Sequence, residues 1–154
     1  MLEHELVHLL LSLGAGAIVF SFYRRWQVLA IALISGFFVD SDHLFDYFLY
    51  KRAFDFDLTE FFKGEFFDLA GKVYVPFHAF EYAFIAIGLG LVFLKTRKSI
   101  TEKKKLAAFL MLAFGISLIF HLVFDTLTYK PKLPTYFILY RIYQQFDHDK
   151  LGFE

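Results

Sequence analysis

Four long apolar stretches, separated by charged residues, dominate the hydrophobic pattern of the chain. They run from Leu6 to Tyr23, from Trp26 to Tyr50, from Val73 to Leu94 and from Leu106 to Leu127. Each holds about 18–25 residues, the length that an α-helix needs to cross a bilayer. The pattern predicts an all-α, polytopic membrane protein with four transmembrane helices in a single domain over residues 1–154.

Two further segments are rich in aromatic residues but too polar to cross a bilayer. Residues 51–72 contain the run AFDFDLTEFFKGEFFDLAG, and the C-terminal tail contains PTYFILYRIYQQF. Short helices that combine aromatic and charged residues favour the interface between membrane and water. We therefore expect interfacial helices in the 51–72 segment and in the C-terminal tail.

The composition supports a membrane location and removes several classes of chemistry. The chain is 58% hydrophobic, with 23 Phe and 9 Tyr among 154 residues, which is more apolar surface than a soluble domain of this size buries. A formal net charge of zero gives no reason to expect a nucleic-acid partner. Without cysteine, the chain has no disulfide, thiolate nucleophile or Cys-ligated metal. Membrane lipids are the expected surroundings, and a homo-oligomer is left open.

Lysine and arginine residues concentrate in two of the predicted connections. The first turn contains Arg24 and Arg25. The connection between the third and fourth stretches contains Lys95, Arg97, Lys98, Lys103, Lys104 and Lys105. Because cytoplasmic loops carry an excess of Lys and Arg, we expect this side to be cytoplasmic and both termini to lie outside.

Each predicted helix carries an ionisable residue at a similar distance from these basic residues. The separations are 16 or 17 residues for His8 to Arg24, Arg25 to Asp42, His78 to Lys95 and Lys105 to His121. At 1.5 Å per residue they correspond to about 24–26 Å. The four helices thus place these groups at one depth, near the outer boundary of the hydrocarbon core.

Histidine and carboxylate residues also recur three or four positions apart, which puts both side chains on one helix face. Ionisable groups at membrane depth cost at least about 2.5–3.5 kcal/mol each, so they pair, line a wet cavity or bind an ion. Imidazole and carboxylate suit zinc, with manganese and iron as further options. We predict one shared site for a divalent metal, with the ligands His8, Asp42, His43, His78, His121 and Asp125.

Other polar residues receive supporting roles. Glu81 and Asp46 each lie one helical turn from a predicted ligand. Asp40 and Glu5 are expected to orient a ligand imidazole, and His4 receives no role. Residues 4–8, HELVH, also match the HExxH zinc motif, but that interpretation leaves the other His and Asp residues unexplained.

The runs GFFVDSDHLFDY and HLVFDTLT, with His78 near a helix start, resemble the YdjM-like membrane-bound metal-dependent hydrolases. The resemblance is closer still to uncharacterised prokaryotic membrane proteins that share one order of motifs. Here those motifs are Asp42, His43 and Asp46, then His78 and Glu81, then His121 and Asp125, then Tyr140 and Arg141. YdjM-like proteins are regarded as distant relatives of zinc-dependent phospholipase C and the fungal single-strand nucleases. The resemblance implies a helical, metal-dependent hydrolase in the inner membrane of a prokaryotic cell.

With a site at the outer headgroup level, the resemblance implies a hydrolase that acts on a phosphate ester or diphosphate of a lipid. In such an enzyme a bound metal would activate water, Glu81 or Asp46 would be the general base, and Arg141 or Lys72 would neutralise the phosphate. A non-catalytic metal-binding or structural accessory protein stays open as the alternative. A metal transporter is disfavoured because the inner halves of the helices, such as AIVFSFY and AIALISGF, are nearly unbroken apolar runs.

Overall fold

The computed structural model describes residues 2–52, 55–95 and 101–152. No strand forms within these ranges, which confirms the predicted all-α class. The elements are α1 (Leu2–Phe22), α2 (Trp26–Gly36), the 3-10 helix η1 (Phe38–Asp42), α3 (His43–Lys51), α4 (Leu58–Lys63), α5 (Phe66–Ala70), α6 (Phe80–Lys95), α7 (Glu102–Tyr129), the 3-10 helix η2 (Leu133–Tyr136), α8 (Ile138–Tyr143) and α9 (His148–Leu151). Arg97 and Lys98 of the predicted basic connection lie outside the described residues.

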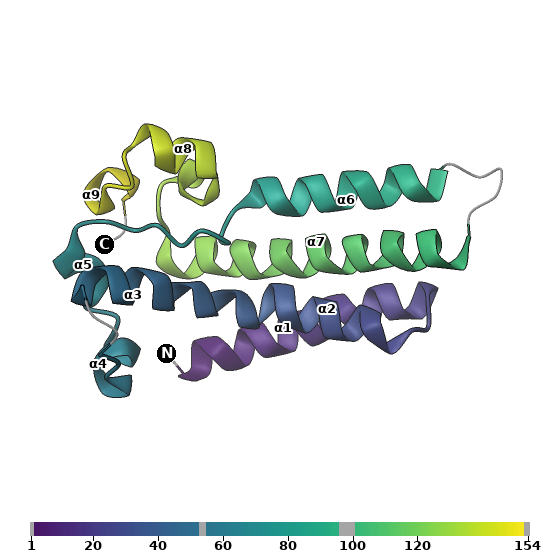
Figure 1. Ribbon diagram of the computed structural model, residues 1–154, viewed down its shortest axis with the longest axis horizontal. Coiled ribbons are helices and arrows are strands. Elements are labelled where there is room, and N and C mark those ends of the chain that lie inside the picture. The colour runs from purple at the N-terminus through teal and green to yellow at the C-terminus, as the bar shows by residue number, and fades with distance from the viewer. Residues whose placement is uncertain (1, 53–54, 96–100, 153–154) are drawn as a thin grey trace.

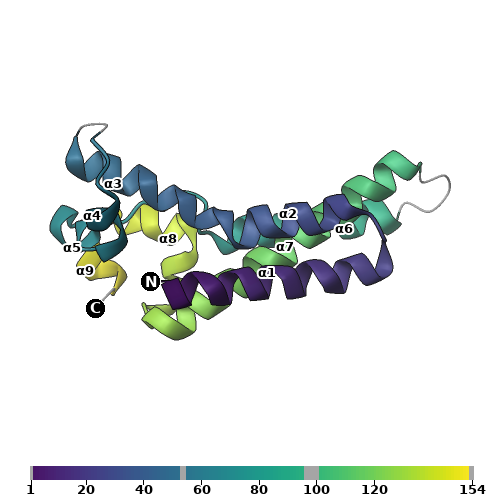
Figure 2. The same cartoon turned by 90° about the horizontal axis from the view of Figure 1, so that it is seen from below.

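Helix α7 is the centre of an elongated bundle (Figure 1). The helices α1, α2 and α6 each pack along it, and α1 also packs against α2. The short helices α4, α5, α8 and α9 form a helical cap at the end of the bundle where α1 begins and α7 ends (Figure 1, Figure 2). The two segments predicted as interfacial therefore form short helices at one end of the molecule.

Small residues bring α6 and α7 unusually close together. A Cβ atom added at Gly115 would lie 2.7 Å from the carbonyl oxygen of Ala83, and one added at Gly90 would lie 2.9 Å from that of Ala108. Helices in lipid associate through such close packing, because lipid tails are as apolar as the side chains they would replace.

We expect Gly115→Ala to destabilise the packing of α6 on α7, by about 1–3 kcal/mol if the neighbouring backbone must shift. The matched control is Gly88→Ala on α6, since no atom lies within 4 Å of a Cβ added there. Thermal unfolding in detergent measures both variants. Equal unfolding temperatures for the two would contradict the close packing at Gly115.

Within the described residues, two helices are long and apolar enough to cross a membrane, over Glu3–Phe22 and Glu102–Tyr129. A third crossing results if α2 and the segment Phe38–Lys51 form one span, bent by 46°. The predicted second helix, 26–50, is thus broken. The predicted third stretch becomes helical only at Phe80, so α6 has 16 residues. By length and apolarity, the part of the chain that the structure describes has two or three candidate spans, fewer than the four predicted.

The break after α2 lies at a point of close contact between three helices. A Cβ added at Gly36 would collide with the hydroxyl groups of Ser117 and Ser12. The carbonyl group of Gly36 accepts a hydrogen bond from Nδ1 of His121 at 2.9 Å. A broken helix is tolerated at membrane depth where another group satisfies the freed backbone in this way. Hydrophobic periodicity alone could not predict it.

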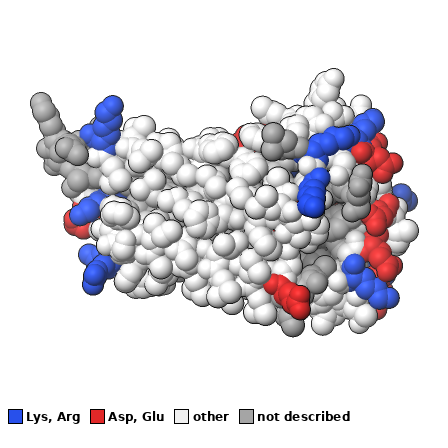
Figure 3. Space-filling model, turned by 180° about the vertical axis from the view of Figure 1, so that it is seen from behind, with Lys and Arg blue, Asp and Glu red and all other residues white. Residues whose placement is uncertain are grey.

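Charged side chains gather at the two ends of the molecule and leave its middle uncharged on the face shown in Figure 3. Large apolar side chains are exposed along the bundle, among them Leu10, Ile18, Ile85 and Val92. Monomeric soluble proteins rarely expose apolar surface this extensive. This uncharged, apolar middle part of the molecule, called the uncharged belt below, is compatible with a lipid environment.

Candidate metal centre

Histidine and aspartate residues from α1, from the turn between α2 and α3, from the segment before α6 and from α7 converge near the helical cap. Each belongs to at least one group of three whose ligand atoms all lie within 4.8 Å of one another. These residues, called the His/Asp cluster below, are His4, His8, Asp40, His43, His78, His121 and Asp125. The first two come from α1, the next two from η1 and the start of α3, and the last two from α7. Buried His and Asp groups in this arrangement could hold a metal ion.

His121 occupies the middle of the cluster and is fully buried. Its Nε2 lies 3.0 Å from Nε2 of His78, 3.0 Å from Oδ2 of Asp125 and 3.5 Å from Oδ1 of Asp40. Because Nδ1 is directed at the Gly36 carbonyl, it carries the proton, and Nε2 keeps its lone pair for a ligand. The broken α2 helix therefore fixes the tautomer that a metal site needs.

His4 and His8 form a second part of the cluster with Asp125. Oδ1 of Asp125 lies 3.1 Å from Nε2 of His4 and 3.0 Å from Nε2 of His8. The two Nε2 atoms are 2.7 Å apart. The spacing of four residues places both rings on one face of α1. Since the other oxygen of Asp125 faces His121, this carboxylate joins the two parts of the cluster.

Asp40 is the second shared carboxylate. Its Oδ1 lies 3.0 Å from Nε2 of His78, 3.3 Å from Nε2 of His43 and 3.5 Å from Nε2 of His121. The 3-10 geometry of η1 aligns side chains three residues apart, which directs Asp40 and His43 to the same side. The turn after α2 thus delivers a carboxylate that a continuous helix would place differently.

The distances within the cluster suit a common cation. Around a tetrahedral zinc ion with bonds of about 2.0–2.1 Å, neighbouring ligand atoms are about 3.3 Å apart. Here the contacts among Nε2 and carboxylate atoms range from 2.7 to 4.0 Å, on both sides of this value. Among the described residues, the buried Oδ2 of Asp40 has no hydrogen-bond partner and lies 4.0 Å from Nε2 of His8. Buried polar atoms are nearly always paired, so a cation would complete this arrangement; the geometry does not select one metal.

Asp42, predicted as a ligand, lies behind His78 and outside the groups of three. Its Oδ2 accepts a hydrogen bond from the backbone N–H of Phe77 at 2.8 Å and lies 3.0 Å from Nδ1 of His78. Nε2 of His78 then faces Asp40 and His121. A carboxylate behind a ligating histidine fixes the ring orientation and makes the imidazole a better ligand. The position of Asp42 corresponds to this orienting role.

The surroundings of His78 favour positive charge. Burial disfavours its protonated form, but the carboxylates of Asp42 and Asp40 outweigh burial and raise the pKa of His78 well above its usual value. The same negative charges attract a metal cation.

We expect Asp42→Asn to weaken metal binding by about 10–100-fold, as is usual when the partner behind a ligating histidine is lost. Asparagine removes the negative charge that faces Nδ1 of His78, and a neutral partner makes the imidazole a weaker ligand. Titration against a chelating indicator measures the affinity. Asp55→Asn, at an exposed position before α4, is the matched control. An unchanged affinity in Asp42→Asn would exclude the orienting role.

A buried arginine and a buried aspartate hold the segment that carries His78. Arg141 is fully buried and donates through its two Nη atoms to the backbone carbonyls of Tyr74, Val75 and His78, at 2.5–2.7 Å. The carboxylate of Asp46 accepts from the backbone N–H groups of Tyr74 and Val75, each at 2.8 Å. These bonds replace those of a helix, which is why α6 starts only after His78.

Glu81 and Asp46, the predicted general bases, belong to none of the groups of three. Both oxygens of Asp46 are already used by backbone amides. Oε1 of Glu81 accepts from the backbone N–H of Leu139 at 3.3 Å and links α6 to α8. Both carboxylates therefore have structural contacts where a catalytic role was predicted.

The predicted phosphate-binding cations are also engaged elsewhere. The guanidinium of Arg141 is directed at backbone carbonyls, and burial lowers its pKa. Nζ of Lys72 donates to the carbonyl of Gln145 at 2.6 Å. Both stabilise the contact between the 72–78 segment and the C-terminal tail.

His4 and Asp40 are the members of the cluster that the predicted ligand set omits. Helical spacing was the available signal, since His4 precedes His8 by four residues and Asp40 precedes His43 by three. The central position of Asp40 depends on η1, and the 3-10 turn has no clear signature in the hydrophobic pattern.

Comparisons of the chain with protein-family models, with curated proteins and with solved structures find no match. The resemblance to YdjM-like hydrolases therefore stays a prediction from the motifs. The candidate metal centre rests on the convergence of its own buried side chains.

Proposed function

We propose that this chain is a membrane-embedded protein whose His/Asp cluster binds at least one divalent metal ion, with zinc preferred. The observation that carries the proposal is the convergence of histidine Nε2 atoms on the shared carboxylates of Asp40 and Asp125. Imidazole and carboxylate together suit zinc, and manganese or iron accept the same donors.

The four helices α1, α2 with α3, α6 and α7 would all cross the membrane. Helix α6 is about 24 Å long at 1.5 Å per residue, and modest thinning of the bilayer accommodates a span of this length. Its outer face is apolar, with Phe84, Ile85 and Leu89 exposed. The end bearing Lys103, Lys104 and Lys105 would then lie in the cytoplasm, and the cluster near the outer headgroups of a prokaryotic inner membrane.

The reaction that suits this site is hydrolysis of a phosphate ester or diphosphate of a lipid. A divalent ion supplies an acidified water and polarises the phosphoryl oxygen. The chain's own residues hold that centre in place: Asp42 orients His78, and Arg141 fixes the backbone of His78. A location near the end of the uncharged belt favours substrates that reside in the membrane.

Release of phosphate from phosphatidic acid and from a polyprenyl diphosphate, by purified protein in nanodiscs, tests the catalytic part. We expect activity that chelation abolishes and zinc restores, and that Asp125→Ala reduces by about 100-fold or more. Asp149→Ala, whose side chain is 98% exposed, is the matched control. A protein that binds metal but hydrolyses neither lipid would favour the non-catalytic, accessory alternative.

A second candidate function rests on the triad of His4, His8 and Asp125. The two histidines belong to the HELVH motif, so this triad has the histidine pair of a zinc peptidase, with Glu5 in the position of its general base. Cleavage of a membrane-protein substrate that is lost in Glu5→Gln, while phosphate release is retained, would distinguish the peptidase from the lipid hydrolase.

A further inference from the structure

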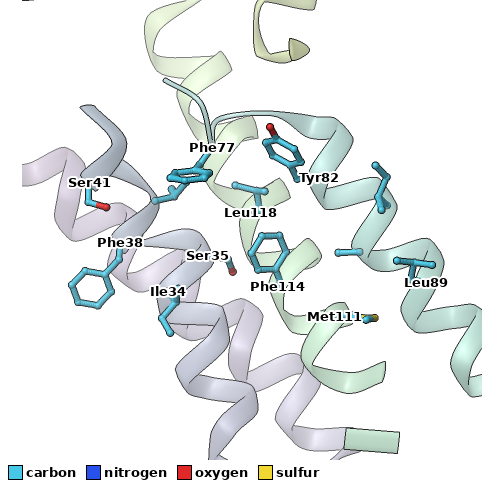
Figure 4. Close-up of a pocket in the computed structure, with 13 residues that line it drawn as sticks. Ile34, Ser35, Phe38, Ser41, Phe77, Tyr82, Leu89, Met111, Phe114 and Leu118 are labelled. Carbon is cyan, nitrogen blue, oxygen red and sulfur yellow. The ribbon is translucent and has the colours of Figure 1, made fainter. Parts of the chain in front are cut away.

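An apolar groove runs along α7 between α2 and α6 (Figure 4). Its volume is about 740 Å³, within the roughly 300–1,000 Å³ usual for small-molecule sites. Ile34 and Phe38 form one wall, Tyr82 and Leu89 the other, and Phe114 lies on the floor. Three hydroxyl groups, from Ser35, Ser41 and Tyr82, are the only polar side-chain groups of its lining.

One end of the groove adjoins the His/Asp cluster. The lining residues Val39, Ser41 and Phe77 are each next in sequence to Asp40, Asp42 or His78. Phe77 provides the closest link, because its side chain lines the groove while its backbone N–H is bonded to Asp42. An occupant of the groove would therefore end beside the segments that carry Asp40, Asp42 and His78.

The groove extends from that end along the axis of the bundle. Met111, at the far end of the lining, lies ten residues before His121 on α7, a distance of about 15 Å along the helix. A lipid chain in a bilayer runs in the same direction as the helices that cross it. The groove therefore matches the two parts of a lipid. Its length is apolar, and the cation-attracting His/Asp cluster lies beside one end.

We propose that this groove holds the hydrocarbon chain of a phosphorylated membrane lipid, whose phosphate group lies at the His/Asp cluster. The inference rests on the proposed metal-dependent function and specifies its substrate as a lipid bound by both chain and phosphate. The apolar lining excludes a polar chain, and the negative phosphate complements a bound cation. Ser41 and Tyr82 offer hydroxyl groups to the oxygens next to the phosphate.

Native mass spectrometry of zinc-loaded protein tests the proposal with three probes. Dioleoyl phosphatidic acid carries both chain and phosphate, dioleoylglycerol carries the chains alone, and inorganic phosphate carries the charge alone. We expect the wild-type protein to retain one phosphatidic acid in preference to dioleoylglycerol, and to lose this preference when zinc is removed by chelation.

Ala86→Trp fills the groove from α6. We expect this variant to retain phosphatidic acid about tenfold less well or worse, because losing the burial of only two methylene groups has an effect of this size. Its zinc content and its binding of inorganic phosphate should be unchanged. Ala17→Trp, exposed on α1, is the matched control and should behave as wild type. Ile85→Trp at the rim of the groove provides a second variant should Ala86→Trp fail to fold.

Zinc-loaded groove variants that retain phosphatidic acid as the wild type does would overturn the groove proposal and leave the metal site intact. A change in oligomeric state, with lipid retention unaltered, would also overturn it and identify a second copy of the chain as the occupant. A wild-type protein that binds no metal would overturn the proposed function and this inference together.

Discussion

His121→Ala is expected to abolish stoichiometric metal binding. Nε2 of His121 lies within 3.0–3.5 Å of His78, Asp125 and Asp40, and the residue belongs to two of the four groups of three. Losing His121 should lower the metal affinity by more than the about 10–100-fold that is usual when a group behind a ligand is lost. The Gly36 carbonyl also loses its hydrogen-bond donor. Metal analysis of the purified variant measures the effect.

Two comparisons separate loss of metal from loss of fold. His148→Ala, in α9 and outside the His/Asp cluster, should keep its metal. A bound ion at 100 times its dissociation constant stabilises a protein by about 2.7 kcal/mol, so chelation should lower the unfolding temperature of the wild type but not of His121→Ala. Stoichiometric metal in His121→Ala would contradict the central position of this residue.

Arg141→Ala is expected to produce the largest loss of stability of any single substitution considered. It removes a fully buried guanidinium and leaves the carbonyls of Tyr74, Val75 and His78 without their donor. It also leaves Asp46 and other nearby acids without a compensating positive charge. Breaking a buried charged network of this kind costs about 3–5 kcal/mol. Thermal unfolding in detergent provides the measurement.

Arg141→Lys should recover little of that loss, because an ammonium group cannot match the fork geometry of a guanidinium that bonds three carbonyls. Arg52→Ala, at the exposed end of α3, is the matched control and should unfold as the wild type does. Because Arg141 fixes the backbone of His78, metal occupancy should fall in parallel with stability. Wild-type stability in Arg141→Ala would contradict the role assigned to this residue.

The helical class and the gathering of ionisable residues follow from information that is local in sequence. Long apolar stretches predict helices, and equal distances from the basic connections place His8, His78 and His121 at one level, where the structure brings them together. Both predictions depend only on helix length and rise per residue.

The parts that sequence did not predict depend on tertiary contacts. The kink after Gly36 depends on hydroxyl groups from α1 and α7 that approach its backbone. The extended segment before α6 depends on Arg141, which is distant in sequence and whose side chain is directed at backbone carbonyls rather than at a ligand. These two departures from regular helix move Asp40 into the cluster, move Asp42 behind His78 and shorten α6.

The central claim, that the His/Asp cluster is a metal site, is tested most directly by anomalous X-ray diffraction at the zinc absorption edge. Crystals should be grown from protein purified with zinc and without chelator. The structure leads us to expect an anomalous peak about 2.0–2.2 Å from Nε2 of His121 and from a carboxylate oxygen of Asp125 or Asp40. Full-length protein with ordered side chains at the cluster and no anomalous peak there would contradict the claim.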